Sequence, residues 1–267
     1  MSTELTPADP CATEFLDRAE IEVEGRLVDA SNATLYCGLS ADGVQAHCVY
    51  KPISGERPLW DFPDGHLAWR ELATYLVSEA AGFHVVPPTV LREGPFGPGM
   101  VQLWVDTDEE SELVDITAPD EVPEGWRPIL RAEDGAGNPA VLAHADVPEL
   151  RAMAALDVVV NNTDRKGGHV LNTAAGVFGV DHGICLHQED KLRTILWGFM
   201  DEPLGDRVRA GLERLSRELD GELGSTLAGY LTAEELHALR TRTRLLRAAD
   251  TYPEPGNQWR AIPWPVF

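Results

Sequence analysis

The chain has 267 residues, of which 43% are hydrophobic, and its formal net charge is −22. This length and composition are typical of a globular protein with a substantial core, built as one large domain or as two lobes. The negative charge repels phosphate backbones and anionic lipid head groups, so we expect neither nucleic acid nor a stable membrane association. Residues 1–17 are polar and acidic, and no apolar stretch reaches the roughly 20 residues of a membrane span. We therefore expect a cytoplasmic protein, and the sequence carries no signal for an oligomeric state.

The N-terminal part has the pattern of a β-sheet with one helix. Strands are predicted at 21–28 and 34–39, joined by the hairpin "DASNAT". A third strand, "VQAHCVYKP", alternates and ends with Lys51, because the following proline cannot continue the ladder. The segment "HLAWRELATYLVSEAAG" has helical spacing, carries Glu71 one turn in, and is expected to end at Gly82.

The middle of the chain is strongly acidic. Residues 105–149 contain 13 Asp or Glu and 2 Arg, a net charge of −11 that is half of the total. This pattern favours a solvated, loop-rich stretch, and it is also compatible with a platform that attracts a cationic substrate.

The second half has the pattern of a mainly helical region. The segment "PELRAMAALDVVV" predicts a buried helix from Pro148, which leads into the polar loop "NNTDRKGGH". The segments "HVLNT" and "VFGV" predict a hairpin that ends at Asp181. Helices follow, one of them opened by a capping box of Thr232 and Glu235, and the tail "YPEPGNQWRAIPWPVF" is expected to pack as an irregular strap.

Lysine is rare in this chain. Of 22 basic residues only three are lysines, namely Lys51, Lys166 and Lys191. Each is therefore a candidate for a position where a compact ammonium is needed and a forked guanidinium would not fit. The presence of Lys166 and Lys191 is also compatible with chance.

Four polar residues follow one another in an order that suggests a reaction. Lys51 ends a strand, Glu71 lies on the next helix, Asp164 lies in a loop after a buried helix, and Asp181 ends a hairpin. Phosphoryl transfer from ATP in kinases uses a phosphate-binding lysine, a helix glutamate that holds it, a loop aspartate for the acceptor hydroxyl, and a metal-binding aspartate, in this order. The spacing is thus typical of an ATP-dependent phosphotransferase.

The residues of these motifs resemble those of a known family. "LDVVVNNTDRKGGHVL" and "VDHG" resemble the catalytic loop and metal motif of the phosphatidylinositol 3- and 4-kinase superfamily, closest to type II phosphatidylinositol 4-kinases. "VYKP", "RELATYLVSEAAGFHVVP" and "VQLWV" are similar to that family's phosphate lysine, glutamate helix and adenine-facing hinge, and the whole chain is similar to an actinobacterial branch related to these kinases. The resemblance implies an α+β, two-lobed protein-kinase-like fold. It would have a flexible tail at 1–18, a β-rich N-lobe with one helix at 19–104, and a mainly helical C-lobe at 105–267.

The resemblance also implies roles for single residues. Asp164 would orient or deprotonate the acceptor hydroxyl, Lys51 would contact the phosphates of ATP, Glu71 would pair with Lys51, and Asp181 would bind Mg²⁺. Further contacts to the nucleotide are implied for Ser31, Asn32, Gln102, Leu103, Trp104, Val105, Arg165 and Lys166.

Two departures from the family pattern leave alternatives open. His169 stands where the family has an asparagine as second metal ligand. Imidazole prefers softer metals, so the site could favour Mn²⁺, use Asn162 or Asn172 instead, or belong to a nucleotide-binding pseudokinase. The segment "HGICLHQEDKLRT" is nearly neutral where lipid kinases place basic residues. The expected hydroxyl acceptor is therefore a soluble small molecule or a protein more than a membrane lipid.

Other classes of function are compatible with some of the residues. A metal-dependent hydrolase could use zinc ligands drawn from Asp164, Asp181, His144, His169, His182 and His187, although no HExxH spacing supports it. A scaffold protein would explain the acidic segment but not the rarity of lysine.

Overall fold

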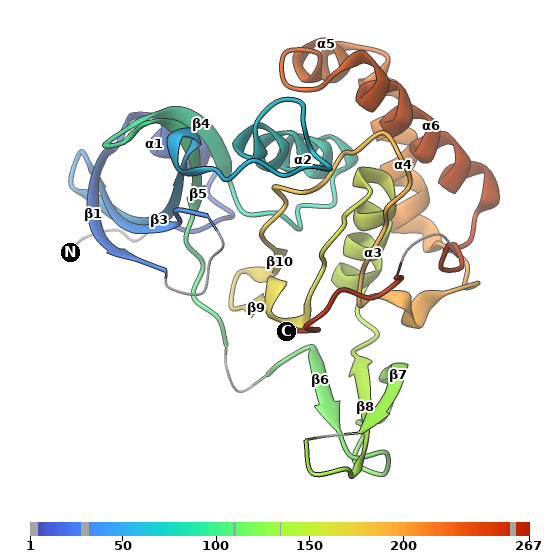
Figure 1. Cartoon of the computed structure of the whole chain (residues 1–267). Helices are drawn as coiled ribbons and strands as arrows, with labels where there is room; N and C mark the ends of the chain where they lie inside the picture. The colour runs from blue at the N-terminus through green and yellow to red at the C-terminus, as the bar shows by residue number, and fades with distance from the viewer. Residues whose placement is uncertain (1–4, 28–31, 109–110, 134, 257–259) are drawn as a thin grey trace.

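The computed structural model describes residues 5–27, 32–108, 111–133, 135–256 and 260–267, and these form two lobes (Figure 1). The N-terminal lobe contains α1 (Ala12–Arg18), β1 (Glu20–Arg26), β2 (Leu35–Ala41), β3 (Val44–Pro52), the 3-10 turn η1 (Ile53–Gly55), α2 (Leu67–Ala81), β4 (Thr89–Gly94) and β5 (Gly97–Leu103). The C-terminal lobe contains β6 (Val114–Thr117), β7 (Arg127–Glu133), β8 (Pro139–His144), α3 (Pro148–Val160), η2 (Gly167–His169), β9 (Val170–Thr173), β10 (Gly176–Gly179), η3 (Trp197–Phe199), α4 (Gly205–Leu219), α5 (Glu222–Leu227) and α6 (Ala233–Ala249).

The N-terminal lobe is an antiparallel sheet with the strand order β1-β2-β3-β5-β4. Strand β3 lies at its centre, and Lys51 pairs with Met100 of β5. The strand ends at Pro52, as expected from the missing N–H. Helix α2 ends before Gly82, whose φ of 63° places it in the left-handed region that glycine adopts without strain. The strands and the helix expected here are confirmed.

Helix α2 connects the two lobes. Its buried residues, among them Ala73 and Val77, belong to one apolar cluster with Leu156 of α3 and Leu212 of α4. Figure 1 shows α2 lying between the sheet and the C-terminal helices. A separate cluster under the sheet is formed by α1 with β2, β3 and β5. Because α2 packs into the C-terminal core, its polar residues hold a fixed position relative to that lobe.

The C-terminal lobe follows the expected pattern. Helix α3 begins at Pro148, where a missing N–H costs nothing, and β9 and β10 form the expected hairpin. The capping box is present, because Thr232 Oγ1 accepts from Glu235 N and Glu235 accepts from Thr232 N. The expected α+β, two-lobed architecture, with a β-rich N-terminal lobe and a mainly helical C-terminal lobe, is confirmed. Among the described residues, none of the helices combines the length and apolar character that crossing a bilayer requires.

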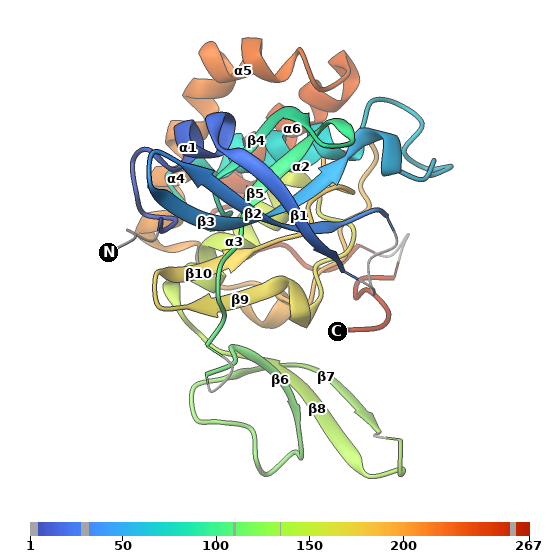
Figure 2. The ribbon, with the colours of Figure 1, turned by 90° about the vertical axis from the view of Figure 1, so that its left-hand side faces the viewer.

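The acidic segment is rich in loops, as expected, because more than half of its described residues lie outside helices and strands. It also contains a sheet that the sequence did not predict: β6, β8 and β7 form a three-stranded antiparallel sheet that projects from the C-terminal lobe (Figure 2). Its central strand, β8, buries small and apolar residues, while acidic side chains stay on the outside. One expectation differs from the structure. The expected flexible tail includes α1, which buries Phe15 and Leu16.

Candidate active site

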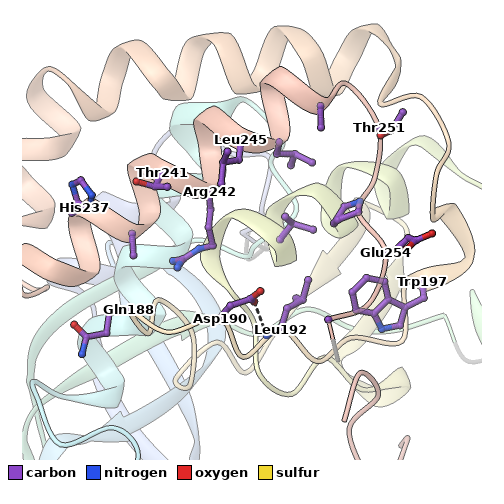
Figure 3. Close-up of a pocket in the computed structure, with 16 residues that line it drawn as sticks. Gln188, Asp190, Leu192, Trp197, His237, Thr241, Arg242, Leu245, Thr251 and Glu254 are labelled. Atoms are coloured by element: carbon purple, nitrogen blue, oxygen red, sulfur yellow. Dashed lines mark hydrogen bonds between the residues drawn. The ribbon is translucent and has the colours of Figure 1, made fainter. Parts of the chain in front are cut away.

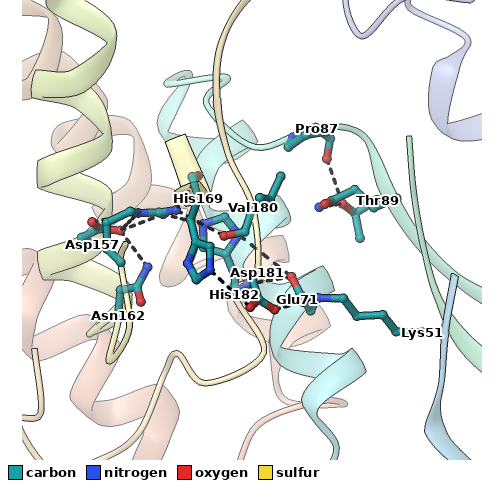
Figure 4. Close-up of polar contacts among 12 residues, drawn as sticks. Lys51, Glu71, Pro87, Thr89, Asp157, Asn162, His169, Val180, Asp181 and His182 are labelled. Carbon is teal, nitrogen blue, oxygen red and sulfur yellow. Dashed lines mark hydrogen bonds and ion pairs between the residues drawn. The ribbon is translucent and has the colours of Figure 1, made fainter. Parts of the chain in front are cut away.

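Lys51, Glu71 and Asp181 meet between the lobes, although they come from β3, α2 and the segment after β10 (Figure 4). The Nζ atom of Lys51 lies 2.6 Å from Oε1 of Glu71 and 2.8 Å from Oδ1 of Asp181. The second oxygen of Glu71, Oε2, accepts a hydrogen bond from the backbone N–H of His182 at 2.8 Å. One buried carboxylate thus holds both the lysine of the first lobe and the backbone beside the aspartate of the second lobe.

These charges stabilise one another. Burial by itself would lower the pKa of Lys51, but the negative charges of Asp181 and Glu71 outweigh it and raise that pKa above its usual value. The Lys51 ammonium in turn lowers the pKa of Asp181, despite the opposing effect of burial. Both groups are therefore charged at neutral pH. The Asp181 side chain is 54% exposed, so its carboxylate is open to a ligand from the space between the lobes.

Hydrogen bonds from its own side chains fix the conformation of the polar loop after α3. Asn161 ends the helix with a φ of 54° and donates from Nδ2 to the carbonyl of His187 at 3.1 Å. Asn162 donates to Asp157 at 3.0 Å and accepts from the backbone N–H of Asp164 at 2.9 Å. These bonds explain why an apolar helix leads into so many polar residues, because the loop needs their side chains to satisfy its backbone.

Asp164 itself points away from this buried network. Its side chain is 28% exposed, and Oδ2 lies 3.1 Å from Nζ of Lys166. The loop therefore presents one carboxylate and one ammonium beside each other at the surface of a fixed backbone.

Arg165 does not have the nucleotide-binding role that the sequence suggested. Its side chain has 0% exposure, and Nη2 lies 2.9 Å from Oδ1 of Asp157, which is also fully buried. The same guanidinium contacts Nε2 of His182 at 2.7 Å. The reason is that Asp157, a charged residue in the middle of an apolar helix, requires a buried cation as its partner. Asn162 is buried, and its Oδ1, the atom that would bind a metal, accepts from the backbone N–H of Asp164, so this side chain is committed to the loop.

Breaking this buried pair should cost much of the stability. We expect Asp157→Asn to lower the free energy of unfolding by about 3–5 kcal/mol, because it leaves the Arg165 guanidinium buried without a counter-charge. Urea denaturation checks this. The exposed Asp201→Asn serves as a control and should change stability by less than about 0.5 kcal/mol. Equal midpoints for Asp157→Asn and the native chain would contradict the structural role of the pair.

His169 lies beside Asp181 as the resemblance implied. Its Nε2 is 3.6 Å from Oδ2 of Asp181, and its Nδ1 is buried without a hydrogen-bond partner. Burial lowers the pKa of His169, so the ring is neutral at pH 7 and can offer a lone pair. Two ligands of one Mg²⁺ ion lie roughly 3 Å apart, so Asp181 and His169 fit a shared cation after a small adjustment. Asn172, the other alternative, uses its side chain to contact Ser111 at 2.7 Å.

The other histidines do not gather as a metal site. His144 packs against Phe199 with ring centroids 4.6 Å apart, and His187 lies edge-on against Phe62. His182 is bound to Arg165, as described above. In the part of the chain that the structure describes, no three His, Cys, Asp or Glu side chains are placed to hold a metal ion. The described residues considered for a zinc hydrolase therefore do not form a site with the three protein ligands that such a metal uses.

The buried histidines should make the fold sensitive to acid. Burial lowers the pKa of His144 to about 4, from an ordinary value of 6.5, and lowers that of His182 well below 6.5. The unfolded chain therefore binds more protons than the folded one between these values, and stability falls as the pH falls from about 6.5 to 4. We expect each such ring to contribute up to about 1.4 kcal/mol per pH unit, measured by denaturation across this range. His144→Phe should reduce the slope, and an unchanged slope would contradict the assignment.

A cavity of about 520 Å³ opens between the lobes next to these residues. It is lined by Leu27, Thr34, Val49, Lys51, Gln102, Leu103, Trp104, Val105, Asp106, Thr107, His169, Leu171, Val180 and Asp181. Half of the lining residues are apolar, and Lys51 and Asp181 contribute charged groups to the same cavity. This distribution fits a ligand with a flat apolar part and an anionic part.

The remaining predicted residues occupy different places. The hinge residues Gln102, Leu103, Trp104 and Val105 all line the cavity. The Gln102 amide, however, donates a hydrogen bond to Thr89 Oγ1 at 2.9 Å, so this amide group has a structural role. Asn32 accepts from the backbone N–H of Arg57 at 2.9 Å. Ser31 lies outside the described residues.

A second cavity, of about 670 Å³, lies along α6 in the C-terminal lobe (Figure 3). It is lined by residues such as Trp197, Arg242 and Leu245, and contains none of the residues predicted for the site. Although it is larger, Lys51 and Asp181 line the cavity between the lobes and not this one.

Sequence comparison places the chain in a family. It is 48% identical over 258 residues to Protein Rv2133c of Mycobacterium tuberculosis (strain ATCC 25618 / H37Rv), which covers 93% of this chain and 92% of that protein. The chain belongs to the family of Protein Rv2133c. It is also 26% identical over 206 residues to phosphatidylinositol 4-kinase gamma 4 of Oryza sativa subsp. japonica, which covers 68% of this chain but only 32% of that protein.

The solved structures with a similar fold include two kinases. The Golgi casein kinase superposes with a TM-score of 0.48 at 14% identity, over 89% of this chain and 72% of that one. The Helicobacter pylori proinflammatory kinase CtkA superposes with a TM-score of 0.46 at 10% identity, over 89% of this chain and 94% of that one. No protein-family model matches the chain.

Proposed function

We propose that this protein is an ATP-dependent phosphotransferase that moves the γ-phosphoryl group of ATP to a hydroxyl acceptor. The observation that carries the proposal is the contact of Lys51 with both Glu71 and Asp181 at the cavity between the lobes. A lysine held by a helix glutamate, beside a metal-binding aspartate, is the arrangement that kinases need for phosphoryl transfer. The sequence likeness to phosphatidylinositol 4-kinase gamma 4 supports the same class of reaction.

The residues have separate roles in this proposal. Lys51 binds the ATP phosphates, and Glu71 keeps its ammonium in place. Asp181 and His169 would hold Mg²⁺ or Mn²⁺, which when bound neutralises charge on the phosphates. Asp164 orients the acceptor hydroxyl and receives its proton, and Lys166 adds positive charge beside it. Positioning of the reactants and neutralisation of charge provide most of the rate enhancement, because the protein forms no covalent bond with the transferred phosphoryl group in this proposal.

The acceptor in this proposal is a soluble small molecule or a protein side chain. The segment after Asp181 contributes no cluster of positive charge, since Lys191 lies 3.7 Å from both Asp61 and Glu189. An inositol phosphate head group would need such a cluster.

The replacement of asparagine by His169 favours one alternative, a pseudokinase that binds nucleotide without transfer. The test titrates the full chain with ATP and either Mg²⁺ or Mn²⁺, and measures the melting temperature and ADP release. A ligand at a hundred times its dissociation constant should stabilise the fold by about 2.7 kcal/mol. Stabilisation without ADP release, also in the presence of polyols and cell extract, would favour the pseudokinase. If the titration produced no stabilisation and no ADP release, nucleotide binding would be refuted altogether.

A further inference from the structure

The end of the chain lies against the loop that carries Asp164. We call residues 260–267 the C-terminal strap. Near its beginning, the carbonyl of Ala261 accepts from the backbone N–H of Thr194 at 3.0 Å and from Nε1 of Trp197 at 2.8 Å. Thr194 also forms an isolated parallel β-bridge with Arg165. The strap, the segment around Thr194 and the Asp164 loop therefore run side by side. Figure 1 shows the end of the chain beside β9, which follows this loop.

The last two residues of the strap contact Gly167 directly. The backbone N–H of Gly167 donates to the carbonyl of Val266 at 2.7 Å. The Phe267 ring covers Gly167 so closely that a Cβ built there would lie 2.6 Å from Cζ and 2.7 Å from Cδ1 of the ring. Only glycine allows this approach, and the requirement comes from space and not from the backbone conformation.

Gly167 joins two residues of the proposed site. It follows Lys166, whose ammonium contacts Asp164, and it opens the turn η2 that ends with His169 beside Asp181. Gly168, the next residue, has open space around its Cβ position. Two successive glycines lose more conformational entropy on ordering than any other pair, so a fixed geometry here requires a contact from outside the segment. Val266 and Phe267 provide that contact at Gly167, whereas the carbonyl of His169 at the end of the turn accepts from the backbone N–H of Val180 at 3.1 Å.

We infer that the C-terminal strap is part of the phosphotransfer machinery and that Phe267 is a positioning residue for Lys166. This inference rests on the proposed function for its kinetic consequence. The contacts of Lys51 with Glu71 and Asp181 do not involve the strap. Removing the Phe267 ring therefore leaves nucleotide binding intact and impairs the transfer step.

The kinetic test compares Phe267→Ala, Phe267→Leu and the control Trp264→Ala, which truncates an aromatic side chain of the same strap that is 76% exposed. With ATP and Mg²⁺ or Mn²⁺, we expect Phe267→Ala to lower kcat for ADP release between about tenfold and a hundredfold while the KM for ATP stays within about threefold. Phe267→Leu restores most of kcat, and Trp264→Ala changes neither constant. Gly167→Ala should lower kcat as Phe267→Ala does. In the double variant the Phe267 ring is absent and no longer clashes with the added methyl group, so its kcat should be higher than the product of the two single effects predicts.

A second measurement does not depend on activity. Hydrogen exchange on the unliganded chain should show faster exchange of the Gly167 amide in Phe267→Ala, with no change in Trp264→Ala and no change in α4. If native protein releases no ADP but this exchange result holds, the proposed function fails and the strap contact stands. Unchanged exchange and unchanged kcat in Phe267→Ala would overturn the inference. Faster exchange throughout the chain with a raised KM would assign Phe267 to general stability and would overturn it as well.

Discussion

Asp181→Asn is expected to abolish turnover and metal-dependent ATP binding. The substitution removes the carboxylate charge that balances Lys51 and that would hold the cation with His169. Loss of several kcal/mol of charge stabilisation corresponds to a fall in rate of roughly a thousandfold or more. Melting temperature with ATP and Mg²⁺, together with ADP release, measures both effects.

A matched control exists for this variant. Asp181 and Asp201 both have a left-handed backbone, with φ of 61° and 63°, and asparagine tolerates this region as well as aspartate does. Asp201 is exposed and outside the cavity, so Asp201→Asn should behave as the native chain does. If Asp181→Asn bound and consumed ATP as the native protein does, the metal assignment would be wrong.

Asp164→Asn is expected to separate binding from transfer. Asp164 does not line the cavity and contacts neither Lys51 nor Asp181 among the described contacts, so the affinity for ATP should stay within about twofold. Transfer should fall by about 10²–10⁴-fold, the usual contribution of a general base. Isothermal titration with ATP and Mg²⁺ measures the affinity, and ADP release measures the transfer.

The backbone of the loop should survive this change, because its fixed point is the N–H of Asp164 bonded to Asn162 and not the carboxylate. Retained ATP affinity together with native rates of ADP release would end the catalytic assignment of Asp164. Loss of both affinity and stability would instead assign this carboxylate to the fold.

Local patterns in the sequence predicted most of the secondary structure. The helical spacing that ends at Gly82, the proline that begins α3, and the capping box of α6 all depend on residues within a few positions of one another. In residues 105–149, where charge dominates, the loop-rich character was predicted but the three-stranded sheet within it was missed, because exposed acidic side chains are compatible with a sheet whose central strand is buried.

The sequence by itself determined which residues to consider for the site, since the rarity of lysine and the order of Lys51, Glu71, Asp164 and Asp181 are properties of the chain alone. Only the tertiary structure decided what each residue contacts. Lys51 and Asp181 are 130 positions apart and meet because α2 packs into the C-terminal core. Packing within the C-terminal lobe buried Arg165, the neighbour of Asp164, against Asp157 of α3. The physical reason is that propensity and capping act over one or two turns of chain, whereas burial and ion pairing depend on which elements pack together.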